Sequence, residues 1–520
     1  MSGSGYHLVP RRAGTALFGA SVPQVVLLGI GAGSVAIGPA VLGAGAGTVA
    51  GAGVLMLCLL LAFMRIGGEP LVHLLPVVIA FLIDTRGERG DGKKEANRPD
   101  LPGLPPSVEL STAPGRAGVS TRTGEAPGLI LDRRNGTITA VLDVRGGPFG
   151  LLDGAGRDRR VVEWARVLTQ FARETPVVHL GWTVQSGPGT AIAIPAQTLL
   201  RPGEAATSGA RSRAKARSSA EQVRAYRQTL AEAAPFLARH DLRLWLTVRP
   251  MRGDRRADPR MIALAAADTL AARCGAAGLH VHAILSAADL HDTLLDHAIP
   301  PSLTSAGPGR GLDGSGVASF PGLAARAGLA AGAGAPPRRR LVPSGGFETQ
   351  AFWDAMRIGA TWHRVFWIAG WPTGTLHPGW LDPLLHEVPC VRTLAVAMRP
   401  VPWRASRRRI NSETVSVDTA VHLRDRHAVR VPVGLAQAHD DIDRRDAELS
   451  AGYPEYAYLG LIDVAAPGRD ELDDACAAII DLAARCGIVD LRPLHGRHHR
   501  AWAATLPFGL VPRQSTTGAP

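Results

Sequence analysis

Histidine is the residue type in this chain whose spacing most suggests chemistry. His495, His498 and His499 lie within the stretch LHGRHHRAWAATLPFGL, and His280 and His282 alternate in LHVHAIL. Imidazole nitrogens bind transition metals and transfer protons near neutral pH. Each group is therefore a candidate for a metal site or a catalytic base.

The alternation in LHVHAIL places His280 and His282 on one face of a strand. Relaxases and related single-strand nucleases hold a metal with a His-hydrophobic-His pair beside a tyrosine nucleophile, for which Tyr226 is the nearest upstream candidate. No third ligand is evident, and such spacing arises by chance among 17 histidines. We therefore favour two solvent-facing positions and keep a metal-dependent nuclease as the alternative.

The C-terminal histidines have no cysteine or acidic residue at metal-ligand spacing. We interpret LHGRHH as a solvated, basic strand end, and RAWAATLPFGL as a return segment that packs against the sheet. Trp362, His363 and Trp367 in ATWHRVFWIAGWP are interpreted as strand residues rather than as a catalytic cluster.

Other enzyme motifs fail on their chemistry. A phosphate-binding P-loop needs G-x-x-x-x-G-K-[ST], and none of the lysines, Lys93, Lys94 and Lys215, lies in that setting. The glycine-rich stretches lack the strand and helix of a dinucleotide site, and neither G-x-S-x-G nor H-E-x-x-H occurs. We therefore assign no catalytic, cofactor-binding or metal residue, and expect a protein that is not an enzyme and needs no cofactor.

The charge balance points to anionic partners. The net charge is +12, and arginine carries almost all of the positive charge. Arginine runs lie at 338–340 and 404–409. Anionic lipid or an acidic protein fits these runs, whereas direct, specific nucleic-acid binding is disfavoured because stacking aromatics do not interleave with them. Five widely spaced cysteines without a C-x-x-C pair fit a reducing compartment.

An uncharged segment from Ala16 to Phe63 predicts two membrane-spanning helices, near 20–41 and 46–64. Its many small residues would let the two helices pack closely. A secretory signal peptide has a much shorter apolar core and is disfavoured.

The flanks of this hairpin predict its orientation. Positive residues on both sides place both flanks, and all that follows, in the cytoplasm: Arg11, Arg12, Arg65, Arg86, Arg89, Lys93 and Lys94. The next apolar stretch, 66–84, contains Glu69 and two prolines. We expect it to lie at the membrane interface or on the hairpin, and a third span is the alternative.

The rest of the chain repeats a strand-helix-strand pattern four times. The first strand of each copy is GTITAVLDVRG, LRLWLTVRP, WHRVFWIAGW and YAYLGLIDVAA, and copies two and four share AARCG before their closing strands. Two such β-α-β units in series form a ferredoxin-like βαββαβ sandwich. The sequence therefore predicts an α+β protein with two ferredoxin-like domains behind a transmembrane hairpin.

The predicted organisation follows from composition. Pro, Gly and charge mark the linkers, and helical insertions at 219–240 and 416–451 precede the strands of copies two and four. The predicted segments are a hairpin with an interfacial helix (1–87), a linker (88–127), a first domain (128–300) with a flexible insert (187–220), a disordered linker (301–345), a second domain (346–510) and a tail (511–520).

Several of these stretches together resemble a known family. GASVPQVVLLGIGAG through GGEPLVHLLPVVIAFLID is similar to the PrgI-like integral membrane proteins of actinobacterial conjugative elements. DAELSAGYPEYAYLGLIDVAA through AATLPFGL resembles the N-terminal region of VirB-type motor ATPases, although no motor follows. The EccE component of type VII secretion shares the general plan and is the second choice.

The resemblance implies a scaffold of a conjugation or secretion apparatus in the cell membrane. Its implied partners are membrane lipid, a separate VirB-type motor ATPase and other apparatus subunits, with a homo-oligomer as a further possibility. An edge strand of either domain would offer a surface for strand addition or self-association.

Overall fold

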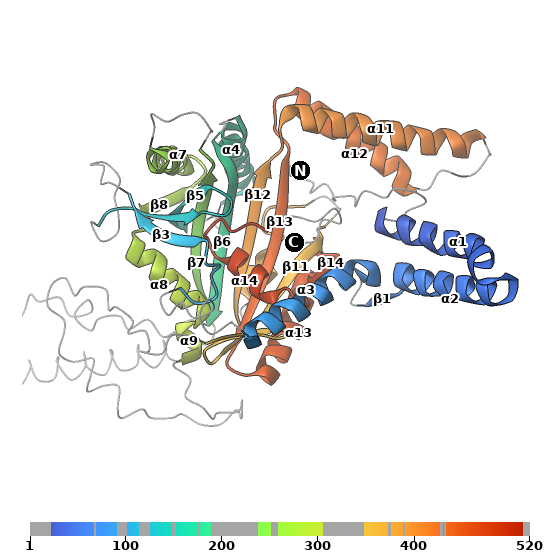
Figure 1. Cartoon of the computed structure of the whole chain (residues 1–520). Helices are drawn as coiled ribbons and strands as arrows, with labels where there is room; N and C mark the ends of the chain where they lie inside the picture. Colours follow the sequence, from blue (N-terminus) through green and yellow to red (C-terminus); the bar gives the residue numbers. More distant parts are fainter. Residues whose placement is uncertain are drawn as a thin grey trace, which may run out of the picture.

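The structure is a computed structural model, and the residues that it describes fall into fourteen stretches. They are residues 22–66, 69–90, 101–113, 125–147, 149, 152–173, 176–188, 238–250, 258–304, 348–372, 376–387, 390–426, 430 and 433–512. Figure 1 shows two helical hairpins and a large sheet covered by helices.

Two apolar helices form the first hairpin. They are α1 (Val22–Leu42) and α2 (Ala44–Phe63), joined at Gly43, whose φ of 85° turns the chain. The helices approach closely because the contact is made of glycine: a Cβ at Gly47 would collide with the carbonyl group of Gly38. Both helices are long and apolar enough to cross a membrane. The two predicted spans are thus helical, within a few residues of the expected bounds.

A third helix connects the hairpin to the sheet. A short β1–β2 turn (Arg65–Ile66 and Glu69–Pro70) leads into α3 (Leu71–Gly90). Phe81 of α3 meets the ring of Trp353 edge-on, with 5.5 Å between the ring centroids. The predicted interfacial segment is therefore a helix that touches both the hairpin and the sheet domain.

One antiparallel sheet contains all the remaining strands. The first half of the chain supplies β3 (Val108–Thr112), β4 (Gly128–Asp132), β5 (Thr137–Gly146), β6 (Val177–Pro188), β7 (Ala238–Val248) and β8 (Leu279–Ile284). Its strand order is β8-β5-β7-β6, with β3 and β4 added beside β5. Helix α4 (Gly154–Arg173) connects β5 to β6 and α7 (Pro259–Cys274) connects β7 to β8, and α8 (Ala287–Ala298) and α9 (Pro301–Thr304) follow β8.

The second half repeats this arrangement. Its strands are β9 (Thr349–Ala351), β10 (Met356–Ile358), β11 (Thr361–Gly370), β12 (Val391–Pro400), β13 (Tyr456–Ala466) and β14 (Asp490–Pro493). The order β14-β11-β13-β12 matches the first half, with β9 and β10 again beside the first strand. Helices α10 (Asp382–His386) and α13 (Arg469–Arg485) connect the strands, and α14 (His498–Thr505) follows β14 as α8 follows β8.

The two halves join through their outermost strands. β6 pairs with β12 in antiparallel register from Ser186↔Arg392 to Leu180↔Met398, so one sheet runs through both predicted domain ranges. These two edges are therefore unavailable for strand addition by a partner.

Both faces of the sheet are buried. On one face, α4 and α7 cover the first half and α10 and α13 cover the second, with Trp182 and Trp371 packed between the two clusters. On the other face a single core spans both halves, closed by α8, by α14 and by Leu101 and Leu104. Figure 1 shows α14 lying across the strands. Burial of this apolar area on two faces is the main force holding the halves together.

Two insertion predictions have different outcomes. The helical insertion predicted at 416–451 is a helical hairpin, α11 (Trp403–Arg426) and α12 (Val433–Ser450), which stands out from the sheet (Figure 1). It starts earlier than expected because Trp403–Arg409 is already helical. Of the insertion predicted at 219–240, residues 219–237 lie outside the described residues, and residues 238–240 belong to β7.

The linker predicted at 88–127 is partly wrong. Residues 101–113 are ordered: Leu101, Leu104 and Val108 are buried, and β3 pairs with β4. A proline-rich stretch orders here because the core of the opposite half covers its leucines, as the close approach of Gly103 to the Trp502 ring shows. Of the flexible insert predicted at 187–220, residues 187–188 belong to β6, and of the disordered linker predicted at 301–345, residues 301–304 form α9. The remainder of both segments, and the predicted tail from 513 on, lie outside the described residues.

Candidate functional site

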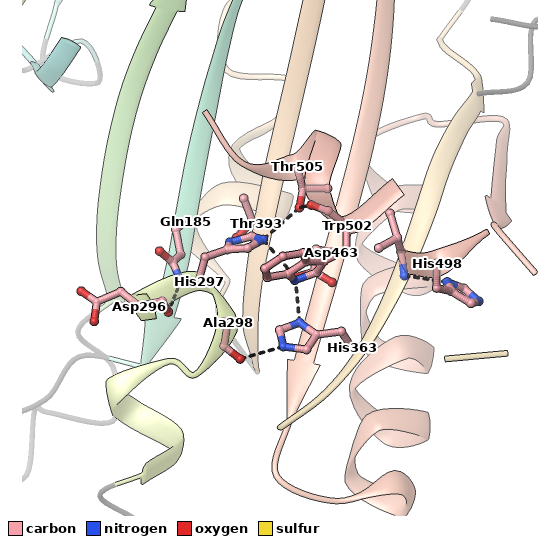
Figure 2. Close-up of polar contacts among 11 residues, drawn as sticks. Gln185, Asp296, His297, Ala298, His363, Thr393, Asp463, His498, Trp502 and Thr505 are labelled. Atoms are coloured by element: carbon pink, nitrogen blue, oxygen red, sulfur yellow. Dashed lines mark hydrogen bonds and ion pairs between the residues drawn. The ribbon is translucent and has the colours of Figure 1, made fainter. Parts of the chain in front are cut away.

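The polar residues that the fold brings together lie between α8, α14 and the strands of the second half. Figure 2 shows His297 and Ala298 from the end of α8, His363 from β11, Thr393 from β12, Asp463 from β13 and Trp502 and Thr505 from α14. The histidine, aspartate and threonine residues of this group are all at most 3% exposed. We call this group the seam network.

His363 and Asp463 form its centre. His363 Nε2 lies 3.0 Å from the carbonyl oxygen of Ala298, which can only accept, so Nε2 carries the hydrogen. His363 Nδ1 lies 3.0 Å from Asp463 Oδ2, and this contact needs one further proton, on the imidazole or on the carboxyl group. The pair is therefore neutral as a whole, which is what burial favours.

His297 extends the network to α14. Thr505 donates its hydroxyl hydrogen to the carbonyl oxygen of Trp502 at 2.7 Å, so it accepts from His297 Nε2 at 2.9 Å. His297 Nδ1 then accepts from the hydroxyl of Thr393 at 3.2 Å. Burial lowers the pKa of His297 to about 4, although Asp463 raises it and His363 lowers it further. A neutral imidazole satisfies every contact in this chain of hydrogen bonds.

Trp502 packs on both imidazoles. Its ring centroid lies 5.1 Å from that of His297 and 5.8 Å from that of His363. Two polar atoms of the group, Trp502 Nε1 and Asp463 Oδ1, have no hydrogen-bond partner among the residues that the structure describes. The network is thus well packed but not fully satisfied, which makes it sensitive to substitution.

Threonine, histidine and aspartate are the residue types of a nucleophile, a general base and an orienting acid, but their geometry in the seam network does not fit those roles. Thr505 donates to a main-chain carbonyl rather than to a histidine, and His297, His363 and Asp463 are all closed off from solvent. This arrangement holds α8 and α14 onto the strands of the second half, in a core that is closed to solvent.

The predicted C-terminal histidine group is only partly as expected. His495 stacks on Trp353, with 6.1 Å between ring centroids, and burial lowers its pKa. His498 starts α14 and is 1% exposed; its Nδ1 accepts from the Val365 amide at 3.2 Å. The interpretation as a solvated strand end is therefore wrong for His498, whose pKa burial lowers to about 3, with a smaller contribution from His495. The predicted return segment is helix α14 and does pack against the sheet.

The other predicted positions are simpler. His280 and His282 are exposed on alternate positions of β8, as the favoured interpretation requires, and Tyr226 lies outside the described residues. No cluster of three metal-ligating side chains occurs in the described part of the chain. Arg407 and Arg409 form ion pairs with Asp446 and Glu455, so the 404–409 run is partly neutralised, and 338–340 lies outside the described residues.

Sequence reasoning missed His297, Thr393, Asp463 and Thr505. One signal was present: Asp463 is the one acid in the apolar strand YAYLGLIDVAA. A lone acid at an inward position of a strand needs a buried partner. The partner itself could not be found, because His363 and His297 lie far away in sequence.

Comparison with known proteins adds no family. No protein-family model matches this chain, and no curated protein is significantly similar to it.

Proposed function

We propose that this chain is a non-enzymatic, membrane-anchored structural component of a conjugation or secretion apparatus. The observation that carries the proposal is the joining of a glycine-packed apolar hairpin to a sheet domain covered on both faces. Such a molecule has a way to sit in a bilayer and a rigid body to present to partners. The residues that combine acid, base and hydroxyl groups lie in a closed core, which fits a scaffold better than a catalyst.

The two halves of the sheet are, in this proposal, ferredoxin-like units. The strand orders β8-β5-β7-β6 and β14-β11-β13-β12 both correspond to 4-1-3-2 in a βαββαβ chain. Two such units fused edge to edge would give a longer platform than either alone, and its ends at β3 and β9 would be the places for further partners.

The proposed location is the cell membrane, as a multi-pass protein with its sheet domain in the cytoplasm. Arginine and lysine on both flanks of the hairpin support this orientation. A cysteine engineered near the N-terminus and one in α4 should both be modified only after a membrane-impermeant reagent is given access to the cytoplasm. Modification of either one from outside would contradict the orientation.

The proposed partner is a separate VirB-type motor ATPase. The detergent-solubilised, crosslinked chain should retain that ATPase during purification. A matched variant that lacks only α11 and α12 then tests whether this projecting helical hairpin makes the contact. Recovery of an EccC-type ATPase instead would favour an EccE-like role in type VII secretion, and recovery of neither would contradict the proposal.

A metal-dependent nuclease using His280 and His282 is the competing enzyme class. The exposure of both side chains leaves them accessible, so the test is direct. His280→Ala with His282→Ala should leave transfer or secretion unchanged under our proposal. A loss of function that Mn²⁺ partly restores in single variants would favour the nuclease.

A further inference from the structure

Helix α3 carries a stripe of large apolar side chains that are about half exposed. Leu75, Ile79, Leu82 and Ile83 are 48%, 49%, 46% and 62% exposed. They recur at the spacing of one helix face. Four large aliphatic side chains in one stripe form a contiguous apolar surface, which a soluble protein rarely leaves in water.

The opposite side of α3 is fixed to the sheet domain. Leu74 is buried, and Phe81 packs edge-on against Trp353. Val77 and Trp353 both reach Gly496, where an added Cβ would lie 3.3 Å from Val77 Cγ1 and 2.6 Å from the Trp353 ring. At about 100° per residue, these positions lie on the side of the helix away from the stripe. Helix α3 thus has one apolar face that packs on the sheet domain and a second apolar face that is exposed.

The length and flanks of α3 indicate what covers the stripe. Its apolar part, Leu74–Ile83, is ten residues long and rises only about 15 Å, half of the roughly 30 Å hydrocarbon core. Asp84, Arg86, Glu88 and Arg89 follow in sequence. Directly before the β1–β2 turn and α3 lies the end of α2, where Phe63 and Met64 are also more than half exposed. The stripe therefore follows closely in sequence on the exposed apolar end of the hairpin, and it is too short to cross a bilayer.

We propose that α3 lies in the headgroup boundary of the membrane, with its stripe in lipid and its other face clamped to Trp353 and Gly496. In this arrangement the β9–α14 corner of the sheet domain is held on the membrane surface in one orientation, rather than tethered by a free linker. The inference rests on the proposed membrane anchor, and it names the lipid surface as the partner of α3.

Depth-dependent quenching tests the lipid contact. The full chain is reconstituted in vesicles of neutral and anionic phospholipid, with an environment-sensitive fluorophore on Ile79→Cys or Ile83→Cys. Val162→Cys on α4, 47% exposed, is the matched control, and Val54→Cys in α2 reports on the span. The native cysteines are buried or half-buried, so the unsubstituted chain gives the labelling background.

The proposal expects blue-shifted emission at positions 79 and 83, quenched most by bromines near the headgroup. Position 54 should be quenched most by bromines deep in the acyl chain, and position 162 by neither. Water-like emission at 79 and 83 would overturn the proposal while quenching at 54 still supports the anchor. Deep quenching at 79 would mean a third span, and no quenching at 54 would reject the anchor itself.

A second measurement tests the clamp. Nitroxides at Ile83→Cys and Val162→Cys should give one narrow distance distribution in lipid nanodiscs. Trp353→Ala should broaden this distance distribution while the quenching at position 79 persists, because the stripe stays in lipid and the sheet domain becomes free to tilt. Trp403→Ala, which removes a half-exposed tryptophan of α11, should leave the distribution narrow. An equally narrow distribution in Trp353→Ala would show that the contact of α3 with Trp353 does not orient the sheet domain.

Discussion

The two halves of the sheet share an order of elements but differ in the polar groups beneath their covering segments. In the first half, Thr139 and Thr247 share a hydrogen bond of 2.8 Å under Gly509, where any Cβ would collide with both hydroxyls. In the second half, the corresponding face carries the His363–Asp463 pair under the end of α8.

Each half is also covered by a segment that belongs to the other half. The helix that follows the first half, α8, ends over His363 of the second half, and the segment that follows α14 crosses to the threonine pair of the first. Each half therefore closes the core of the other. The two halves therefore form one body, because the apolar core on this face contains residues of both.

The largest expected effect comes from separating the halves. Fragments 101–304 and 348–512 should each fail to fold, because each would expose the apolar face that the other covers, whereas mixing or co-expressing them should restore a protease-resistant complex. Proton NMR dispersion and limited proteolysis measure this. One fragment that is well dispersed and resistant alone would show that the exchanged covers are dispensable.

Removal of the buried acid should have the next largest effect. Asp463→Ala leaves His363 Nδ1 without its partner in a closed core and should lower the free energy of unfolding by about 3 kcal/mol. Asp473→Ala is the matched control: Asp473 pairs with Arg364 at 2.7 Å but its side chain is 58% exposed, so its loss should cost at most about 1 kcal/mol. Urea unfolding of the full chain in detergent, followed by near-ultraviolet circular dichroism, compares the two. Equal losses would contradict a buried role for Asp463.

The same burial predicts a pH dependence. His297 and His498 have pKa values lowered to about 4 and about 3, below the 6.5 of an unfolded chain, so the unfolded state binds more protons in between. Stability should therefore be complete above pH 6.5 and fall by about 1.4 kcal/mol per pH unit and histidine as the pH decreases toward 5. His297→Gln should reduce this slope in a pH series of urea midpoints. A slope that the substitution leaves unchanged would show that His297 is not the titrating group.

The features that the sequence predicts well are local ones. An uncharged apolar run predicts a long apolar helix by itself, and alternation with a following helix identified all eight strands of the four repeats. The pairing of β6 with β12 was not predictable, because both strands are apolar and any of several edges could have met.

The missed features depend on contacts between distant residues. His297 and Thr505 lie 208 residues apart, so no spacing rule connects them. Helix α14 follows Gly496 and Arg497 and begins with two histidines, which is a poor helix start. It forms because Trp502 and Thr505 are buried against the other half. The ordered stretch at 101–113 likewise needs the core that Trp502 closes.

The threonine pair should give the smallest effect and the clearest contrast with the histidine–aspartate pair. Thr247→Val leaves the Thr139 hydroxyl without its partner and should cost about 1 kcal/mol. The double variant Thr139→Val with Thr247→Val should recover most of that loss, because two methyl groups of similar shape replace two hydroxyls and leave no unpaired polar group. No apolar pair has the shape of His363 with Asp463, so His363→Leu with Asp463→Leu should remain destabilised, with the carbonyl oxygen of Ala298 losing its donor. A double-mutant cycle on each pair, from urea midpoints, measures this contrast, and equal recovery in the two cycles would mean that the polar difference between the halves has no energetic consequence.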